Sequence, residues 1–414
     1  LGLEISKAKL TRAKHAKILP RFELRNVWGP SPRARGELAP SGGFVISPDT
    51  ATSIPGDLRY FTELDVDLLQ PIFTFGRLSG ATKAASFGVE AEEANVLKEK
   101  GKVRFQVRQL YWAFVLGKEL LAVVQDADEE LTKAENKVEK QLDEGSDEVS
   151  QTDLFKLQIF RYDINERLRE ARGKRDLTDS ALKTTLGLED DVGIEVATEY
   201  LEPLDVRIDS LDVYYEMAYR NRPELSQLRA GISARRALVN VRKSEYFPQF
   251  FLGAEIKYNF AEDRFDPNNP FIYNPTNFFR PGIVAGINLN LNFWQTRDKV
   301  RIAQAEYLQL AQKEKLLLDG IKLDVQRVYI ELRQVARNMR DSRRALKASE
   351  NWLRSTSMTF DIGVGDVKEL IDAFKANGAM QAKHLENIFK YNVAIAKLGK
   401  AVGKDLYPDE LIKE

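Results

Sequence analysis

The feature that most restricts the fold is an order of segments that occurs twice along the sequence. Each copy has a helical stretch, two alternating stretches joined by a polar loop, a very long helical stretch, a glycine turn and a last helical stretch. Short matches keep the copies in register: LPRF (19–22) with FPQF (247–250), QVRQLYWAF (106–114) with VQRVYIELR (325–333), and Gly145 with Gly363. Because repeats decide an architecture before single motifs do, we expect an internal duplication.

The alternating stretches predict β-strands that have one apolar and one polar face. Every other residue is apolar over 250–260 and over 283–293, and the residues between them are largely polar. Successive side chains of a strand point to opposite faces, so the apolar residues share one face. We therefore expect strands at about 18–29, 60–75, 246–261 and 282–294.

These strands admit two interpretations. One is a half-buried sheet of a soluble protein. The other is the wall of a membrane barrel, with an apolar face toward lipid and a polar face toward water. The barrel is favoured because Leu64, Val66 and Leu68 alternate with acids, an arrangement that is hard to place in a soluble core. On this interpretation the residues predicted to face the lumen are Glu63, Asp65, Asp67, Glu255, Lys257, Asn288 and Asn290.

The segments between the strands predict long helical hairpins. Apolar residues recur at alternating spacings of three and four, which is the heptad pattern of coiled coils, with Asp128 and Glu135 at two seam positions. One hairpin should span about 78–187 with its turn at Gly145. The other should span about 296–403 with its turn at Gly363 and Gly365. Stretches rich in proline, glycine and asparagine at 29–57 and 261–282 should be loops.

The two copies also set the expected domain boundaries. Residues 1–187 form the first repeat, beginning with a partial helix. Residues 188–222 form a linker and equatorial segment, and residues 223–414 form the second repeat with a C-terminal tail. Four strands cannot close a membrane barrel alone, because the smallest such barrels have about eight. Several chains must therefore share one barrel.

Composition argues against several other classes of protein. The formal net charge of +0 gives no electrostatic case for a nucleic-acid partner. The absence of cysteine removes disulfides, zinc–thiolate sites and thiol nucleophiles. His15 and His384 lie far apart in sequence without a catalytic constellation, and no phosphate-binding loop is present. We expect no enzyme, no cofactor, no metal and, without a long apolar run, no transmembrane helix.

Several motifs, in this order, resemble the TolC-like outer-membrane efflux and secretion channels of Gram-negative bacteria. They are LLQPIFTFGR (68–77), NRPEL (221–225), YFPQF (246–250), LNFWQTRDKVRIAQAE (291–306), FDIGVGDVKELIDA (360–373) and NVAIAKLGKAVG (392–403). The resemblance covers nearly the whole chain. The sequence departs from the family at its start, where most of the helix before the first strand and a signal peptide are missing.

This resemblance implies a homotrimer of mixed α and β structure. Three chains would share one β-barrel in outer-membrane lipid, each giving four strands, and antiparallel helical coiled coils would continue it as a tunnel into the periplasm. Substrate would pass from an inner-membrane pump or ABC transporter through a periplasmic adaptor, as in tripartite efflux or type I secretion. Gly145, Gly363 and Gly365 would mark the helix tips that dock the adaptor. The alternative is an envelope scaffold of the same fold that transports nothing.

The resemblance also implies a gate at the periplasmic entrance, formed by Phe360, Glu369 and Asp372, with the two acids as a constricting ring. The acids are three residues apart on a predicted helix and share a face. A second interpretation stays open, because Asp366 with Glu369 three residues later is the pattern of a helix capping box. The sequence identifies neither the substrate nor the pump nor the adaptor.

Overall fold

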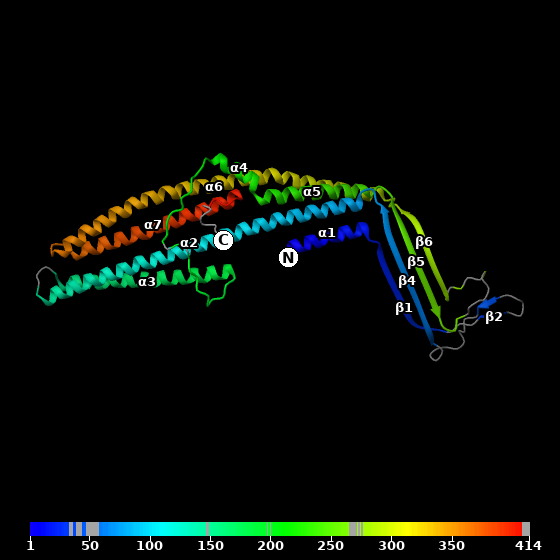
Figure 1. Cartoon of the computed structure of the whole chain (residues 1–414), viewed down its shortest axis with the longest axis horizontal. Coiled ribbons are helices and arrows are strands. Elements are labelled where there is room, and N and C mark those ends of the chain that lie inside the picture. The colour runs from blue at the N-terminus through cyan, green and yellow to red at the C-terminus, as the bar shows by residue number, and fades with distance from the viewer. Residues whose placement is uncertain are drawn as a thin grey trace. The chain divides into compact units, whose positions relative to one another are not determined.

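The computed structural model describes residues 1–32, 36–38, 44–46, 58–145, 149–196, 198, 200–264, 271, 274 and 276–407. The chain divides into two units (Figure 1). The first, Leu1–Glu93 with Gln227–Lys313, holds a four-stranded sheet, and the second, Ala94–Ser226 with Glu314–Glu414, holds two helical hairpins. Parts of both predicted loops, of the turn after Gly145 and of the C-terminal tail lie outside the described residues.

The sheet of the first unit is antiparallel, with the strand order β1-β4-β5-β6. The strands are β1 (Arg21–Pro32), β4 (Leu58–Phe73), β5 (Gln249–Ala261) and β6 (Phe278–Asn288). The two halves of the sequence meet where β4 pairs with β5, with Val66 opposite Ile256. The edge strands β1 and β6 both contain proline, which has no N–H to donate and is tolerated at an edge.

Two sequence-based boundaries are wrong. The alternation predicts a strand over 282–294, whereas β6 ends at Asn288 and a helix begins at Phe293. The Asn290 side chain accepts a hydrogen bond from the Asn292 N–H at 2.9 Å, and such local bonds compete with a strand ladder. The loop predicted over 29–57 contains the end of β1 and a short antiparallel pair, β2 (Gly36–Leu38) with β3 (Phe44–Ile46).

Four helical segments accompany the sheet in the first unit. They are α1 (Gly2–Ile18), most of α5 (Pro223–Ser244), and the starts of α2 (Arg77–Asp143) and α6 (Phe293–Asp361). A Cβ on Gly80 would lie 2.8 Å from Val241 Cγ2, so this glycine allows α2 and α5 to approach closely. The Thr82 hydroxyl of α2 donates to the Ala13 carbonyl of α1 at 3.3 Å. A close glycine contact thus joins α2 to α5, and a hydroxyl hydrogen bond joins α2 to α1.

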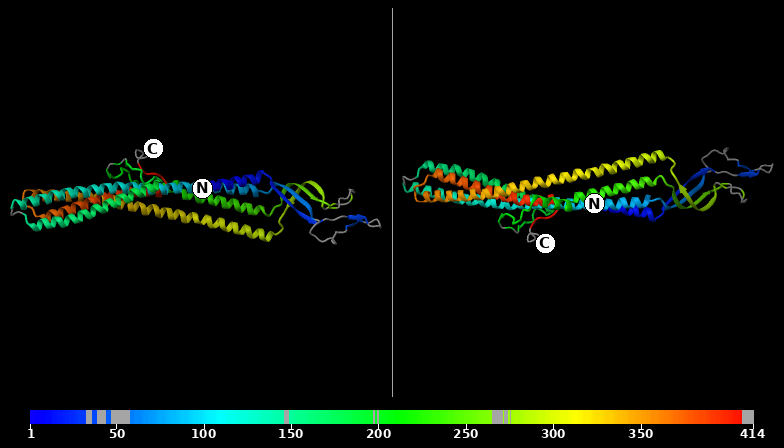
Figure 2. Two further views of the ribbon diagram at one scale, coloured as in Figure 1. Left: turned by 90° about the horizontal axis from the view of Figure 1, so that it is seen from below. Right: turned by 90° about the horizontal axis from the view of Figure 1, so that it is seen from above.

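The second unit confirms the two predicted hairpins. The helix α2, of 67 residues, folds back into α3 (Gln151–Leu186), and α6, of 69 residues, folds back into α7 (Val367–Val402). The second helix of each hairpin, α3 or α7, has 36 residues, so the two hairpins have closely similar lengths. The hairpins lie side by side (Figure 2), where Lys375 of α7 lies 3.4 Å from Asp163 of α3.

The irregular segment between the two repeats is fastened to α7. It precedes α4 (Leu211–Asn221) and packs Leu201 and Leu204 into a core shared with α2, α6 and α7. The fully buried Asn392 accepts a hydrogen bond from the Leu204 N–H at 2.9 Å and donates to the Glu202 carbonyl at 2.8 Å. A buried amide satisfied on both sides fixes the path of a backbone that lacks helix or strand bonds.

Candidate functional site

One face of the sheet carries a row of charges that crosses all four strands. Arg25, Asp65, Lys257 and Arg280 occupy neighbouring positions on β1, β4, β5 and β6. An Arg25 guanidinium nitrogen lies 3.7 Å from Glu63 and another lies 4.0 Å from Asp65. The Arg25 side chain is 68% exposed, and ion pairs that water screens in this way contribute at most about 1 kcal/mol each. A dense charged face of this kind is compatible with water and costly to bury in a dry core.

The opposite face of the sheet is apolar and exposed. The row beside the charged one consists of Leu24, Val66, Ile256 and Pro281. Leu24 is 63% exposed, and Ile283 of β6 is 82% exposed. Aliphatic side chains this exposed, gathered on one face, mark a surface that contacts lipid or other protein.

The strand register places six of the seven predicted lumen residues on the charged face. Glu63, Asp65 and Asp67 alternate along β4, and Glu255 and Lys257 lie beside them on β5. Asn288 is the partner of Gln249, which lies on the same face as Glu255. Asn290 lies beyond the end of β6 and does not belong to the sheet. The common face follows from register, because a shift of one residue would turn every side chain over.

The predicted glycine turns lie at the ends of the hairpins. Gly145 has φ +70° and Gly363 has φ +80°, a conformation that glycine adopts without steric cost. Gly365 is required for a different reason. A Cβ there would lie 2.6 Å from the Phe360 backbone nitrogen, so this turn closes tightly against the end of α6.

The two candidate gate acids lie on the exposed side of α7. Glu369 and Asp372 are exposed, whereas Leu370 between them is buried against the other helices. Asp366 is the N-cap of α7, and its side chain accepts a hydrogen bond from the Lys368 N–H at 2.9 Å. Among the described residues, the Asp366 N–H forms no hydrogen bond with the Glu369 side chain, although a capping box requires one. The capping-box interpretation therefore accounts for Asp366 and leaves Glu369 without a capping partner.

Phe360, the third residue assigned to the gate, is a core residue in this structure. Its side chain is 5% exposed and packs in a cluster with Leu131 of α2, Leu157 of α3 and Leu370 of α7. The hairpin needs an apolar side chain here to fill the space between its helices. In this structure Phe360 therefore packs in the core, whereas the two acids assigned to the gate are exposed.

Lys137 holds the end of α6. Its ammonium group donates to the carbonyls of Phe360 at 3.2 Å and Asp361 at 3.0 Å, and also to the Asp361 carboxylate at 3.0 Å. A cation at a helix C-terminus satisfies free carbonyls and complements the helix dipole. The two hairpins are thus joined near their tips, a contact that the heptad pattern does not predict.

A metal-binding group and a membrane-spanning helix are both absent from the part of the chain that the structure describes. None of their His, Asp and Glu side chains forms a group of three or more that could hold a metal ion. Their helices include none that is long and apolar enough to span a bilayer. His384 Nδ1 lies 3.0 Å from the buried Ser342 hydroxyl, between α7 and α6, where it supports helix packing.

The architecture matches solved structures over almost its whole length. Neither a protein-family model nor a curated protein matches the sequence. The outer membrane protein VceC of Vibrio cholerae has 14% identity and a TM-score of 0.71, over 98% of this chain and 91% of that chain. The open state of the Neisseria gonorrhoeae MtrE outer membrane channel has 14% identity and a TM-score of 0.74, over 98% and 85% of the two chains. CusC, whose structures describe transmembrane channel formation, has 15% identity and a TM-score of 0.74, over 97% and 87%.

The chain has the TolC-like outer-membrane channel fold. At this identity the similarity establishes the fold alone.

Within the TolC-like fold, the sequence pattern also contains the signal for a group of ion-paired residues between α2 and α3. Asp128 and Glu135 occupy apolar seam positions of α2, and Arg161 of α3 contacts both, reaching Asp128 at 2.9 Å and Glu135 at 2.7 Å. Two acids one heptad apart in a seam predict a basic partner on the facing helix.

Proposed function

We propose that this protein is an outer-membrane channel formed by three copies of the chain, each contributing four strands to one closed barrel. The observation that carries the proposal is the sheet itself, with one charged face, one exposed apolar face and two edge strands, β1 and β6. Closing such a sheet with symmetric copies pairs both edges and gives a wet interior and a lipid-facing exterior. The solved channels that share the fold support this assignment.

The proposal gives the charged face the role of lumen wall. Glu63, Asp65, Asp67, Glu255 and Lys257 would then line a water-filled passage of mixed charge. Strands of membrane barrels alternate in this way because lipid and lumen contact opposite sides of each strand. We also infer that the matching lengths of the two halves reflect an internal duplication.

The helical hairpins would extend this passage into the periplasm. The channel would act as the passive exit duct of a tripartite efflux pump or type I secretion system, and it would perform no catalysis. The turns at Gly145, Gly363 and Gly365 would dock a periplasmic adaptor, because they lie at the hairpin ends and Gly145 has open space at its Cβ position. An inner-membrane pump or ABC transporter would supply the substrate.

The acids of α7 would form the closable end of this duct. Glu369 and Asp372 project from the exposed side of the helix, and threefold symmetry would bring three copies of each around one axis. Rings of carboxylates select cations and bind divalent ions. The role belongs to these two side chains and does not include the buried Phe360.

Planar-bilayer recordings of the double variant Glu369→Ala/Asp372→Ala test this function. We expect the variant to conduct, with selectivity for K⁺ over Cl⁻ reduced and block by Mg²⁺ weakened by roughly a factor of several, because the carboxylate ring is gone. The matched control is Asp341→Ala/Glu350→Ala, which removes two exposed acids of α6 and should leave both properties unchanged.

Each outcome of these recordings has a distinct meaning. Conductance with selectivity unchanged in the Glu369/Asp372 variant would contradict the gate and leave the duct intact. A folded assembly that conducts neither as wild type nor as the Glu369/Asp372 variant would contradict the duct and favour an envelope scaffold of the same fold.

A further inference from the structure

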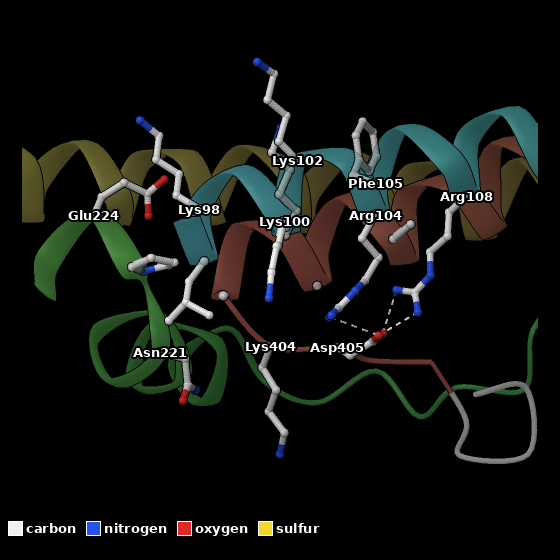
Figure 3. A pocket seen from close by; sticks show the side chains of 17 residues that line it. Lys98, Lys100, Lys102, Arg104, Phe105, Arg108, Asn221, Glu224, Lys404 and Asp405 are labelled. Carbon is white, nitrogen blue, oxygen red and sulfur yellow. Dashed lines mark hydrogen bonds and ion pairs between the residues drawn. The ribbon is translucent and has the colours of Figure 1, made fainter. Parts of the chain in front are cut away.

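A cavity of about 390 Å³ lies in the second unit, between α2, the junction of α4 and α5, and the end of α7 (Figure 3). Its volume falls within the range of small-molecule sites in proteins. None of its lining residues belongs to the charged sheet face or to the hairpin tips. The channel function therefore leaves this cavity unexplained.

Basic side chains dominate the lining of the cavity. From α2 come Lys98, Lys100, Lys102, Arg104 and Arg108. The end of α7 and the segment after it add Lys400 and Lys404. The acids among the lining residues are Glu224 and Asp405. The lining thus holds seven basic and two acidic residues, and this excess of basic residues favours a positive potential in the cavity.

Asp405 forms an ion pair with Arg108. Its carboxylate accepts hydrogen bonds from both terminal nitrogens of Arg108, at 2.7 and 2.6 Å, and lies 3.6 Å from Arg104. This bidentate pair fixes the arginine at one end of the cavity (Figure 3). Asp405 therefore leaves little negative charge for the lysines.

The lysines lack acidic partners of their own. Among the described residues, no carboxylate forms an ion pair with Lys98, Lys100 or Lys404, whereas Lys102 pairs with Glu99 at 3.5 Å. In Figure 3, Lys100 and Arg104 point from α2 toward the segment that carries Asp405, whereas Lys98, Lys102 and Lys404 point away from that space. Gathering like charges around a concave space is unfavourable unless an anion neutralises them.

We propose that this cavity binds a phosphate-bearing anion, with Lys100 and Arg104 as its main contacts. A phosphate monoester carries a charge of about −1.5 to −2, which suits two neighbouring cations better than a single carboxylate. Lysine binds phosphate as a mobile point charge and tolerates varied ligand geometry.

Titration calorimetry on the full chain, purified in detergent at low ionic strength, tests the site with inorganic pyrophosphate. The wild type should bind, and added salt should weaken binding because the contact is electrostatic. Lys100→Ala/Arg104→Ala should weaken affinity roughly tenfold or more, corresponding to two lost charge contacts. The matched control, Lys347→Ala/Lys368→Ala, removes two exposed lysines outside the cavity and should bind like the wild type.

A competition experiment then determines whether the bound phosphate belongs to a soluble molecule or to a lipid headgroup. Detergent micelles doped with phosphatidylglycerol compete with pyrophosphate if the cavity accepts a headgroup, and phosphatidylcholine micelles serve as the reference. Competition assigns the site to a lipid phosphate, and its absence assigns it to a soluble one. Binding of neither probe, or equal weakening in both double variants with helical circular dichroism intact, would overturn the proposal. These results do not depend on whether the assembly conducts.

Discussion

Arginine in place of Val66 should destabilise the assembled protein by about 2–4 kcal/mol, the cost of a basic side chain on the lipid side of a barrel near the middle of the bilayer. Val66 lies near the middle of β4, between Leu24 and Ile256 on the apolar face. Lipid cannot solvate a guanidinium group at this depth. Reversible unfolding by denaturant from lipid vesicles would measure the loss.

The matched control places the same residue on the other face. Asn259 of β5 lies opposite Glu63, so Asn259→Arg adds a cation beside an acid on the charged face. We expect its unfolding free energy to stay within about 0.5 kcal/mol of the wild type, as for most surface changes. Equal losses in the two variants would contradict the assignment of one face to lipid and the other to water.

Asp405→Asn should lower the free energy of unfolding by about 2 kcal/mol, because it leaves the Arg108 guanidinium partly buried with a weakened partner. Asp405 fixes the C-terminal segment to α2, where the Arg108 guanidinium also lies 3.7 Å from the centre of the Tyr407 ring. Burial raises the pKa of Tyr407 to about 12, which keeps its hydroxyl neutral, and Trp112 Nε1 donates to that hydroxyl at 2.7 Å.

The pair of Asp405 with Arg108 also predicts that the stability of the protein depends on pH. Burial is the largest single influence and would raise the pKa of Asp405. The hydrogen bonds from Arg108 and from the Tyr407 N–H, together with the charges of Arg108 and Arg104, outweigh burial and lower the pKa below its ordinary value of 3.8. The stabilisation is therefore present above pH 3.8 and is lost as the pH falls through the lowered pKa. The difference between wild type and Asp405→Asn in thermal unfolding should shrink over that acid range. Asp341→Asn, which breaks an exposed pair with Arg344, is the control and should have little effect at any pH.

The elements that the sequence predicts correctly depend on local pattern. Heptad spacing gives the helices of both hairpins, and glycine at 145 and 363 gives their turns, because helix period and backbone conformation are properties of neighbouring residues. Alternation likewise gives the two faces of the sheet. The pattern continues past the true end of β6, since apolar residues keep alternating while the Asn290 side chain ends the ladder.

The features that the sequence does not predict depend on which helices meet. Phe360 stands beside a glycine turn and is expected at an entrance, yet three other helices bury it. Lys137 and Asp361 are 224 residues apart in sequence, so no local pattern links them. The basic cavity joins residues of α2 to the end of α7 in the same way. Such sites emerge only when the hairpins pack together.

We propose that three chains close one barrel, and the mass of the purified particle in detergent tests this proposal. Light scattering corrected for bound detergent should give three copies of the 47.1 kDa chain. Images of the same particles should have threefold symmetry. A stable monomer that stays soluble after the detergent is removed would contradict both the shared barrel and the lipid-facing sheet.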